Sequence, residues 1–152
     1  MDKFLKNIPL KTFLCHSHAD REAVHALYKR LKRNHIVPWL DRENLLPGQN
    51  WPHEIRTAIL RSDVVIVCLS AEFDKKKGFR HQELKIALRK AQVLPREDIF
   101  IIPVRFEECS MPDAIRHLHR VDLFEEDGYQ KLLQALRKYI ADKSSGTLPR
   151  TG

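Results

Sequence analysis

Glu83 is the residue whose type and setting in this sequence could do chemistry. It follows an apolar, β-branched run at 64–69, which predicts a strand buried on both faces. A polar loop at 71–78 and an amphipathic helix come next, and we expect Glu83 in the first turn of that helix. Ligands of open α/β sheets bind beyond the carboxyl ends of the strands. Glu83 is therefore either a substrate-binding carboxylate or only a favourable charge at a helix N-terminus.

Histidine and tryptophan supply the other candidates. The pairs His16/His18 and His117/His119 have His-x-His spacing, but a metal site needs a third ligand and supporting contacts. No Asp or Glu stands at a spacing from these histidines that would indicate a metal site. We therefore interpret the histidines as polar loop or surface residues and expect no bound metal.

Two tryptophans flank the segment 41–50. Trp39 is expected in the core, and Trp51 at the start of the next helix is either a hydrophobic staple or a ring for a flat ligand. Phe79 is a second candidate for such stacking.

The motifs that are missing exclude several enzyme classes. The chain has five glycines, and none of them forms the Gly-rich fingerprint of a dinucleotide-binding fold or of a phosphate-binding P-loop. No Gly-x-Ser-x-Gly elbow is present, which argues against an esterase-type hydrolase.

Composition indicates one cytoplasmic domain. The chain has 152 residues, of which 43% are hydrophobic and 31% charged, and no apolar run is long enough to span a bilayer. Its N-terminus is too short and polar for a signal peptide. The three cysteines are odd in number and form no Cys-x-x-Cys, which is typical of reduced thiols. The net charge of +7 could favour binding of an acidic partner such as a nucleic acid. The basic residues are spread along helices, however, so direct nucleic-acid binding is not expected.

Short apolar strands alternate with helices along the chain. Strands are expected at 11–15, 36–40, 64–69, 99–104 and 121–124. The pattern predicts an α/β fold, a flavodoxin-like three-layer sandwich with a five-stranded parallel sheet in the order 2-1-3-4-5. Pro38 places the second strand at an edge. The segments 15–18 and 70–83, together with Asp41, should then surround one crevice.

Local signals set the helix starts and the domain bounds. Asp20 is expected to cap the helix that follows it, and either Asn50 or Trp51 is expected to cap the helix that contains Pro52. We expect residues 1–10 to lead into a domain at 11–141, followed by a polar, flexible tail at 142–152.

Five segments in order carry a family resemblance. They read TFLCHSHAD (12–20), WLDRENLLPGQNWPHEIRTAI (39–59), SDVVIVCLS (62–70), FRHQELKIAL (79–88) and IIPV (101–104). Together they resemble a Toll/interleukin receptor (TIR) domain of the bacterial, NAD-cleaving type. Phe79 stands where that family usually has Trp, and Cys15-His16 where it commonly has Ser-Tyr.

The resemblance implies an activity and a set of site residues. It implies an NAD+ nucleosidase that breaks the nicotinamide–ribose bond and releases nicotinamide with ADP-ribose or a cyclised product. Glu83 falls on the family's catalytic glutamate. The residues expected to bind NAD, which is a substrate and not a cofactor, are His16, Ser17, Asp41, Gly48, Trp51 and Phe79.

The resemblance also implies partners. The segment 41–50 corresponds to the loop through which TIR domains contact one another, and its paired leucines, Leu45 and Leu46, are apolar for a loop. We therefore expect self-association, together with a separate sensor domain or protein, in a signalling or defence effector. The alternative is a non-catalytic module that only docks onto other TIR domains.

Overall fold

The computed structural model describes residues 9–73, 79–95 and 98–144, without the side chains at 42, 79–81, 143 and 144. Within these residues the strands are β1 (Lys11–Cys15), β2 (Val37–Trp39), β3 (Val64–Leu69), β4 (Ile101–Arg105) and β5 (Val121–Asp122). The longer helices are α2 (Arg21–Arg33), α4 (Trp51–Arg61), α5 (Phe79–Gln92) and α6 (Gly128–Ser144). The short ones are α3 (Asp41–Asn44) and the 3₁₀ turns η1 (His18–Asp20) and η2 (Asp113–Ile115).

The strands form one parallel sheet in the order β2-β1-β3-β4-β5. The predicted flavodoxin-like order is confirmed, and β2, which contains Pro38, lies at an edge as expected. Both β1 and β3 have the predicted bounds. Strands β2 and β5 are shorter than predicted, and β4 is shifted so that it ends on Arg105.

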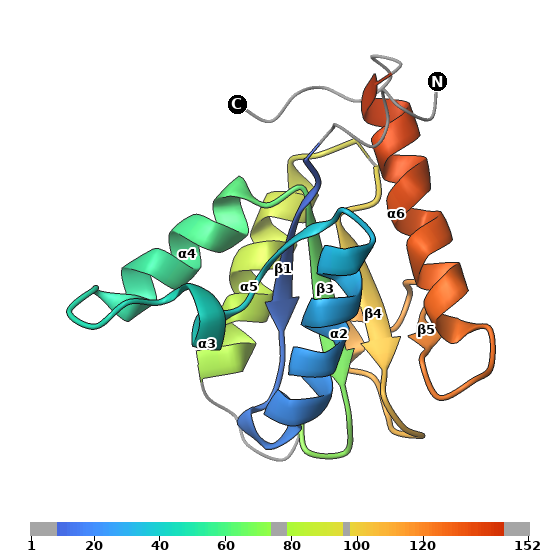
Figure 1. Cartoon of the computed structure of the whole chain (residues 1–152), viewed down its shortest axis with the longest axis horizontal. Coiled ribbons are helices and arrows are strands. Elements are labelled where there is room, and N and C mark those ends of the chain that lie inside the picture. The colour runs from blue at the N-terminus through green and yellow to red at the C-terminus, as the bar shows by residue number, and fades with distance from the viewer. Residues whose placement is uncertain (1–8, 74–78, 96–97, 145–152) are drawn as a thin grey trace.

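Helices cover both faces of the sheet because β3 is buried on both (Figure 1). Val64, Ile66 and Cys68 face a core formed with α2 and α6. Val65, Val67 and Leu69, which alternate with them, face a second core formed with α4 and α5. The three-layer prediction therefore holds, and the apolar run at 64–69 is the reason for it.

One of the two predicted helix caps is wrong. Asn50 caps α4 as predicted, because its side chain accepts a hydrogen bond from the His53 amide at 3.3 Å. Asp20 precedes α2 but makes no side-chain cap bond. Its carboxylate instead accepts a hydrogen bond from the Ser70 hydroxyl at the end of β3. The tertiary contact has displaced the local one, and it ties the start of α2 to β3.

The position of Glu83 in its helix also differs from the prediction. Helix α5 begins at Phe79, so Glu83 lies in the second turn and not in the first. The favourable field of a helix N-terminus fades within the first turn. A helix-start charge is therefore a poor explanation for this carboxylate.

A buried ion pair joins β4 to β5. The Arg105 guanidinium donates from Nε and Nη2 to the two carboxylate oxygens of Asp122 at 2.7 and 2.8 Å. Its Nη1 donates to the Cys109 carbonyl at 2.8 Å, which satisfies donors that burial would otherwise leave unpaired. Hydrogen bonding from Arg105 holds the pKa of Asp122 below its usual value, against the opposing effect of burial.

Gly128 lets α6 begin close to this pair. A Cβ at this position would overlap the Asp122 carbonyl oxygen, so a larger residue would push α6 away from β5. The apolar stripe of α6 is buried against the sheet as predicted. The helix itself continues to Ser144, beyond the expected start of the polar tail at 142.

Replacing Asp122 should destabilise the fold strongly. We expect Asp122→Asn to lower the free energy of unfolding at pH 7 by about 3 kcal/mol, because it removes the carboxylate that accepts two hydrogen bonds from the buried Arg105 and leaves only the exposed Glu108 as its counter-charge. The carboxylate's contribution is present above the unfolded-state pKa and is lost as the pH falls through the lower folded-state pKa. The gap between the two proteins should therefore close in acid. Urea unfolding at several pH values measures it.

Glu108→Gln is the matched control. Its side chain is 81% exposed, and its carboxylate contacts the same Arg105 at 3.3 Å. We expect a change within about 0.5 kcal/mol. Equal losses in the two variants would mean that burial of the Arg105–Asp122 pair is not what matters.

Candidate functional site

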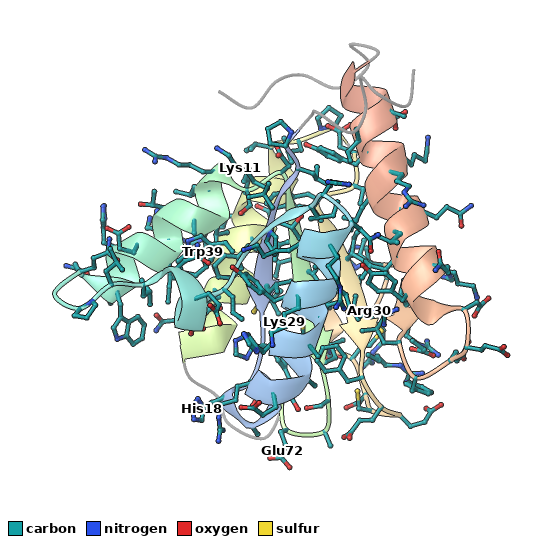
Figure 2. All side chains as sticks on the ribbon, in the orientation of Figure 1. Lys11, His18, Lys29, Arg30, Trp39 and Glu72 are labelled. Atoms are coloured by element: carbon teal, nitrogen blue, oxygen red, sulfur yellow. The ribbon has the colours of Figure 1, made fainter. Side chains whose placement is uncertain are left out.

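A cavity of about 640 Å³ lies at the carboxyl ends of β1 and β2 and is also lined by residues of α2, α3, α4 and α5. Its size is within the range of small-molecule sites. Figure 2 shows that His18 lies at the carboxyl end of the sheet and Trp39 farther up, beside α4. The residues that line the cavity are Phe13, Leu14, His16, His18, Arg21, Trp39, Leu40, Asp41, Leu45, Trp51, Ile55 and Glu83.

The cavity collects four of the residues singled out from the sequence. They are His16, Asp41, Trp51 and Glu83, which come from four different elements. Ser17 and Gly48 are not among the lining residues. The Ser17 hydroxyl instead accepts a hydrogen bond from the Ala19 amide and caps η1, and Gly48 has a φ of 88° in the turn before α4.

Two further predictions about the crevice have different outcomes. Phe79 opens α5, but its side chain lies outside the described residues. Ser70 was expected at the crevice and does not line the cavity; it is buried, and its hydroxyl bonds to Asp20. The cavity therefore lies toward the β1–β2 side of the sheet.

Glu83 is a buried carboxylate with access to this cavity. Its exposed fraction is 8%, whereas the sequence suggested a more open position. Leu84 and Ala87, on the same side of α5, are buried in the core and fix the helix against the sheet. A carboxylate held in this way is presented at a defined place and is largely withdrawn from water.

His16 has a defined orientation beside Glu83. Its Nδ1–H donates to the Ser17 carbonyl at 2.8 Å, and its Nε2 lies 3.6 Å from Oδ1 of Asp41. Burial alone would lower the pKa of His16. Hydrogen bonding to Asp41 and Ser17 and the charges of Asp41 and Glu83 outweigh burial, so the pKa is raised above its ordinary value. The imidazole is thus biased toward its charged form.

The segment 41–50 begins as a helix and not as a loop. Asn44 stabilises α3 because its side-chain oxygen accepts a hydrogen bond from the Leu40 amide at 3.0 Å. Two histidines hold this short helix. His16 pairs with Asp41, and Nε2 of His25 on α2 lies 2.6 Å from Oε1 of Glu43. Two histidine–carboxylate contacts therefore hold α3, which forms part of the rim of the cavity.

The paired leucines of this segment have different roles. Leu45 is partly buried, lines the cavity and packs on the α4–α5 core. Leu46 is 65% exposed. That this segment mediates self-association stays a prediction, and of the two leucines Leu46 is the one that presents its side chain to solvent.

The sequence reading missed several lining residues. Trp39 was assigned to the core; it does stack on Phe13, with ring centroids 5.2 Å apart, but it is only partly buried and also faces the cavity. Trp51 is half exposed at the start of α4, in a place where it could stack on a ligand. His18 was expected at the crevice, as part of the segment 15–18, but not as a binding residue. Arg21 was not expected there.

The described residues contain no group of three or more His, Cys, Asp and Glu side chains arranged to hold a metal ion. His117 and His119 are exposed. Cys15 and Cys68 are buried and Cys109 is partly buried, and none of the three is in a disulfide. In the same part of the chain, no helix is long and apolar enough to cross a membrane.

Sequence and structure comparisons agree on one family. The family model described as TIR domain matches residues 12–136. None of the curated proteins matches this sequence. The TIR domain of the Toll-related receptor TRR-2 from Hydra magnipapillata is similar in structure, with a TM-score of 0.69 and 24% identity over 86% of this chain and 97% of that one.

Two other solved structures share the fold. The TIR domains of the activated Roq1 resistosome, which recognises the effector XopQ, align with a TM-score of 0.57 and 19% identity over 87% of this chain and 84% of that one. The CMP N-glycosidase BcmB of Clostridium botulinum aligns with a TM-score of 0.53 and 16% identity over 82% and 98%. At these identities the likeness shows the fold alone.

The His16–Asp41 pair should make stability depend on pH near neutrality. A group whose pKa is raised on folding contributes fully below its unfolded pKa, about 6.5 for histidine, and loses that contribution as the pH rises through the folded value. We therefore expect His16→Gln to cost more stability at pH 6 than at pH 8. Urea unfolding of both proteins at the two pH values measures this. A difference that is independent of pH would rule out the charged pair.

Proposed function

This chain belongs to the TIR domain family, and from that premise we propose that it cleaves NAD+ at the nicotinamide–ribose bond. The observation that carries the proposal is the placement of Glu83. This buried carboxylate, at the position of the family's catalytic glutamate, lines a cavity together with His16, Asp41 and Trp51.

The chemistry of the bond suits a single carboxylate. Loss of nicotinamide leaves positive charge on the ribose, in an oxocarbenium-like transition state. Glu83 would accept hydrogen bonds from the ribose hydroxyls and stabilise that charge. Glycoside hydrolases use two carboxylates because their leaving group needs a proton, whereas nicotinamide leaves as a neutral molecule without one.

The cavity offers the remaining groups that the reaction needs. Trp51 provides a ring on which nicotinamide can stack, and the apolar wall made by Trp39, Leu45 and Ile55 limits the entry of bulk water. One water molecule, or in cyclisation a nitrogen of the adenine ring, then bonds to the ribose carbon that nicotinamide has left and gives the product. His16 contacts Asp41, and the charges of Asp41 and Glu83 both favour its protonated form, which would offset the repulsion between the two carboxylates. The fold is also compatible with such chemistry, since the CMP N-glycosidase that shares it is named for cleavage of an N-glycosidic bond.

Self-association is the second part of the proposal. Leu46 exposes an apolar side chain at the rim of the cavity, and a neighbouring copy that covers it would also cover the cavity mouth. Assembly would then exclude water from the site and raise activity. A sensor domain or protein that brings copies together would act as the trigger, in a cytoplasmic signalling or defence setting.

Glu83→Gln tests the catalytic role. The substitution is nearly isosteric, so the thermal midpoint should change little. Cleavage of NAD+ should fall by about 10²- to 10³-fold, as is typical when a charge-stabilising group is removed. Nicotinamide release, followed chromatographically with and without a crowding agent, measures the rate.

Glu108→Gln is again the better control for this experiment. Glu107 accepts a hydrogen bond from the Ala71 amide at 2.9 Å and so supports the end of β3, whereas Glu108 is largely exposed. Glu108→Gln should cleave NAD+ at nearly the wild-type rate. If Glu83→Gln stays within a few-fold of wild type, Glu83 is not catalytic.

Leu46→Asp tests the assembly. Leu46 is exposed, so a charge there should not disturb the monomer but should weaken self-association about tenfold or more and lower NAD+ cleavage with it. Sedimentation velocity and nicotinamide release report the two effects. Val93→Asp, at a residue that is 82% exposed after α5 and does not line the cavity, is the control. Full activity in a monomeric Leu46→Asp protein would contradict the coupling.

The alternative is a docking module without catalysis, and the exposed Leu46 supports it equally well. The two proposals differ in one result. An assembled wild-type protein that releases no nicotinamide from NAD+ is a docking module, and Leu46→Asp would then abolish binding to its TIR partner only.

A further inference from the structure

The ionisable groups that line the cavity come from different elements. Arg21 and His18 come from the segment that leaves β1 and enters α2, at the carboxyl end of the sheet. The carboxylates Asp41 and Glu83 come from α3 and α5, with His16 beside Asp41. The aromatic and aliphatic wall belongs to β1, β2, α4 and the segment between β2 and α4. A ligand that fills this space meets the Arg21 guanidinium and the His18 ring on one segment and carboxylates on two other elements.

Arg21 is built to meet an anion at the cavity wall. Its Nη1 donates to the backbone carbonyl of His18 at 3.2 Å, which holds the guanidinium at the turn that carries His18. The carboxylate of Glu22 lies 4.0 Å from Nε, a weak surface contact because both side chains are well exposed. The guanidinium is 49% exposed, so it can receive a ligand without the cost of a buried charge. Its planar set of N–H donors matches the oxygens of a phosphate group.

We propose that Arg21 and His18 form a phosphate subsite that binds the 5′-phosphate of the nicotinamide mononucleotide half of NAD+. The inference rests on the proposed function and names the part of the substrate that the cavity holds. In this orientation the phosphate meets Arg21 and His18, and the cationic nicotinamide ring meets the aromatic wall and the carboxylates. The reverse orientation would set the phosphate against Glu83 and Asp41, where like charges repel.

The subsite defines a substrate class. Nicotinamide mononucleotide carries the 5′-phosphate and should bind, whereas nicotinamide riboside has the same ring and sugar but lacks the phosphate and should bind poorly. Because the phosphate takes no part in bond cleavage, its contact strengthens the ground state and the transition state alike. Loss of Arg21 should therefore raise KM for NAD+ and leave kcat nearly unchanged.

Binding to the full chain carrying Glu83→Gln tests this without turnover. Isothermal titration calorimetry with nicotinamide mononucleotide and with nicotinamide riboside gives the two dissociation constants. Adding Arg21→Gln should weaken mononucleotide binding about tenfold, as expected for a charge-assisted hydrogen bond, and leave riboside binding unchanged. Arg33→Gln removes the same charge from an exposed position at the other end of α2 and should change neither constant.

The outcomes separate this inference from the proposed function. Equal weakening of both ligands by Arg21→Gln, or no mononucleotide binding at all, would overturn the phosphate subsite. Mononucleotide binding that depends on Arg21, in a wild-type protein that never cleaves NAD+, would keep the subsite and reject the nucleosidase.

Discussion

Because every side chain of β3 is buried, helices have to cover both faces of the sheet, and the rest of the molecule follows from this requirement. Alternate residues of β3 supply two separate cores, one with α2 and α6 and the other with α4 and α5. Helix α2, which connects β1 to β2, and helix α5, which connects β3 to β4, therefore lie on opposite faces of the sheet. Where they part, beyond the carboxyl end of β1, the sheet leaves a hollow. The cavity therefore lies where the helices that cover the two faces of the sheet separate.

Polar contacts at the carboxyl edge hold the surrounding segments in place. Ser70 bonds to Asp20, Glu107 accepts the amide of Ala71, and Arg105 pairs with Asp122. Each contact joins chain segments that are far apart in the sequence. The first two lie at the carboxyl end of β3. These contacts fix the residues that directly follow β3 and β4, and they tie the start of α2 to the sheet.

The rim of the cavity is held by a different kind of contact. Helix α3 has four residues and too little apolar surface to fix itself, and it depends on His16 and His25 to hold its carboxylates. The same Asp41 that anchors the rim also raises the pKa of His16 beside Glu83. Local stability and the charge state of the site are therefore coupled through one imidazole.

The sequence by itself determined the strands, their parallel order and the identity of the main carboxylate. A run such as 64–69 is apolar throughout because both faces of the strand are buried, and Pro38, which has no N–H to donate, favours an edge strand, so the sequence carries both signals locally. Helix α6 could be predicted for the same reason, because the spacing of its own apolar residues shows which side is buried. Glu83 stood out because it followed such a strand in a recognisable motif.

Only the tertiary structure decided which side chains meet. The Asp20 carboxylate accepts a hydrogen bond from Ser70 instead of capping α2. Leu45 packs against the α4–α5 core, whereas Leu46 is exposed. Neither outcome could be read from spacing, because in each case the competing partner lies on another element. Arg21, His18 and Trp39 joined the site in the same way. A strand reveals its burial through its own residues, whereas a cavity is made by residues that become neighbours only after the chain has folded.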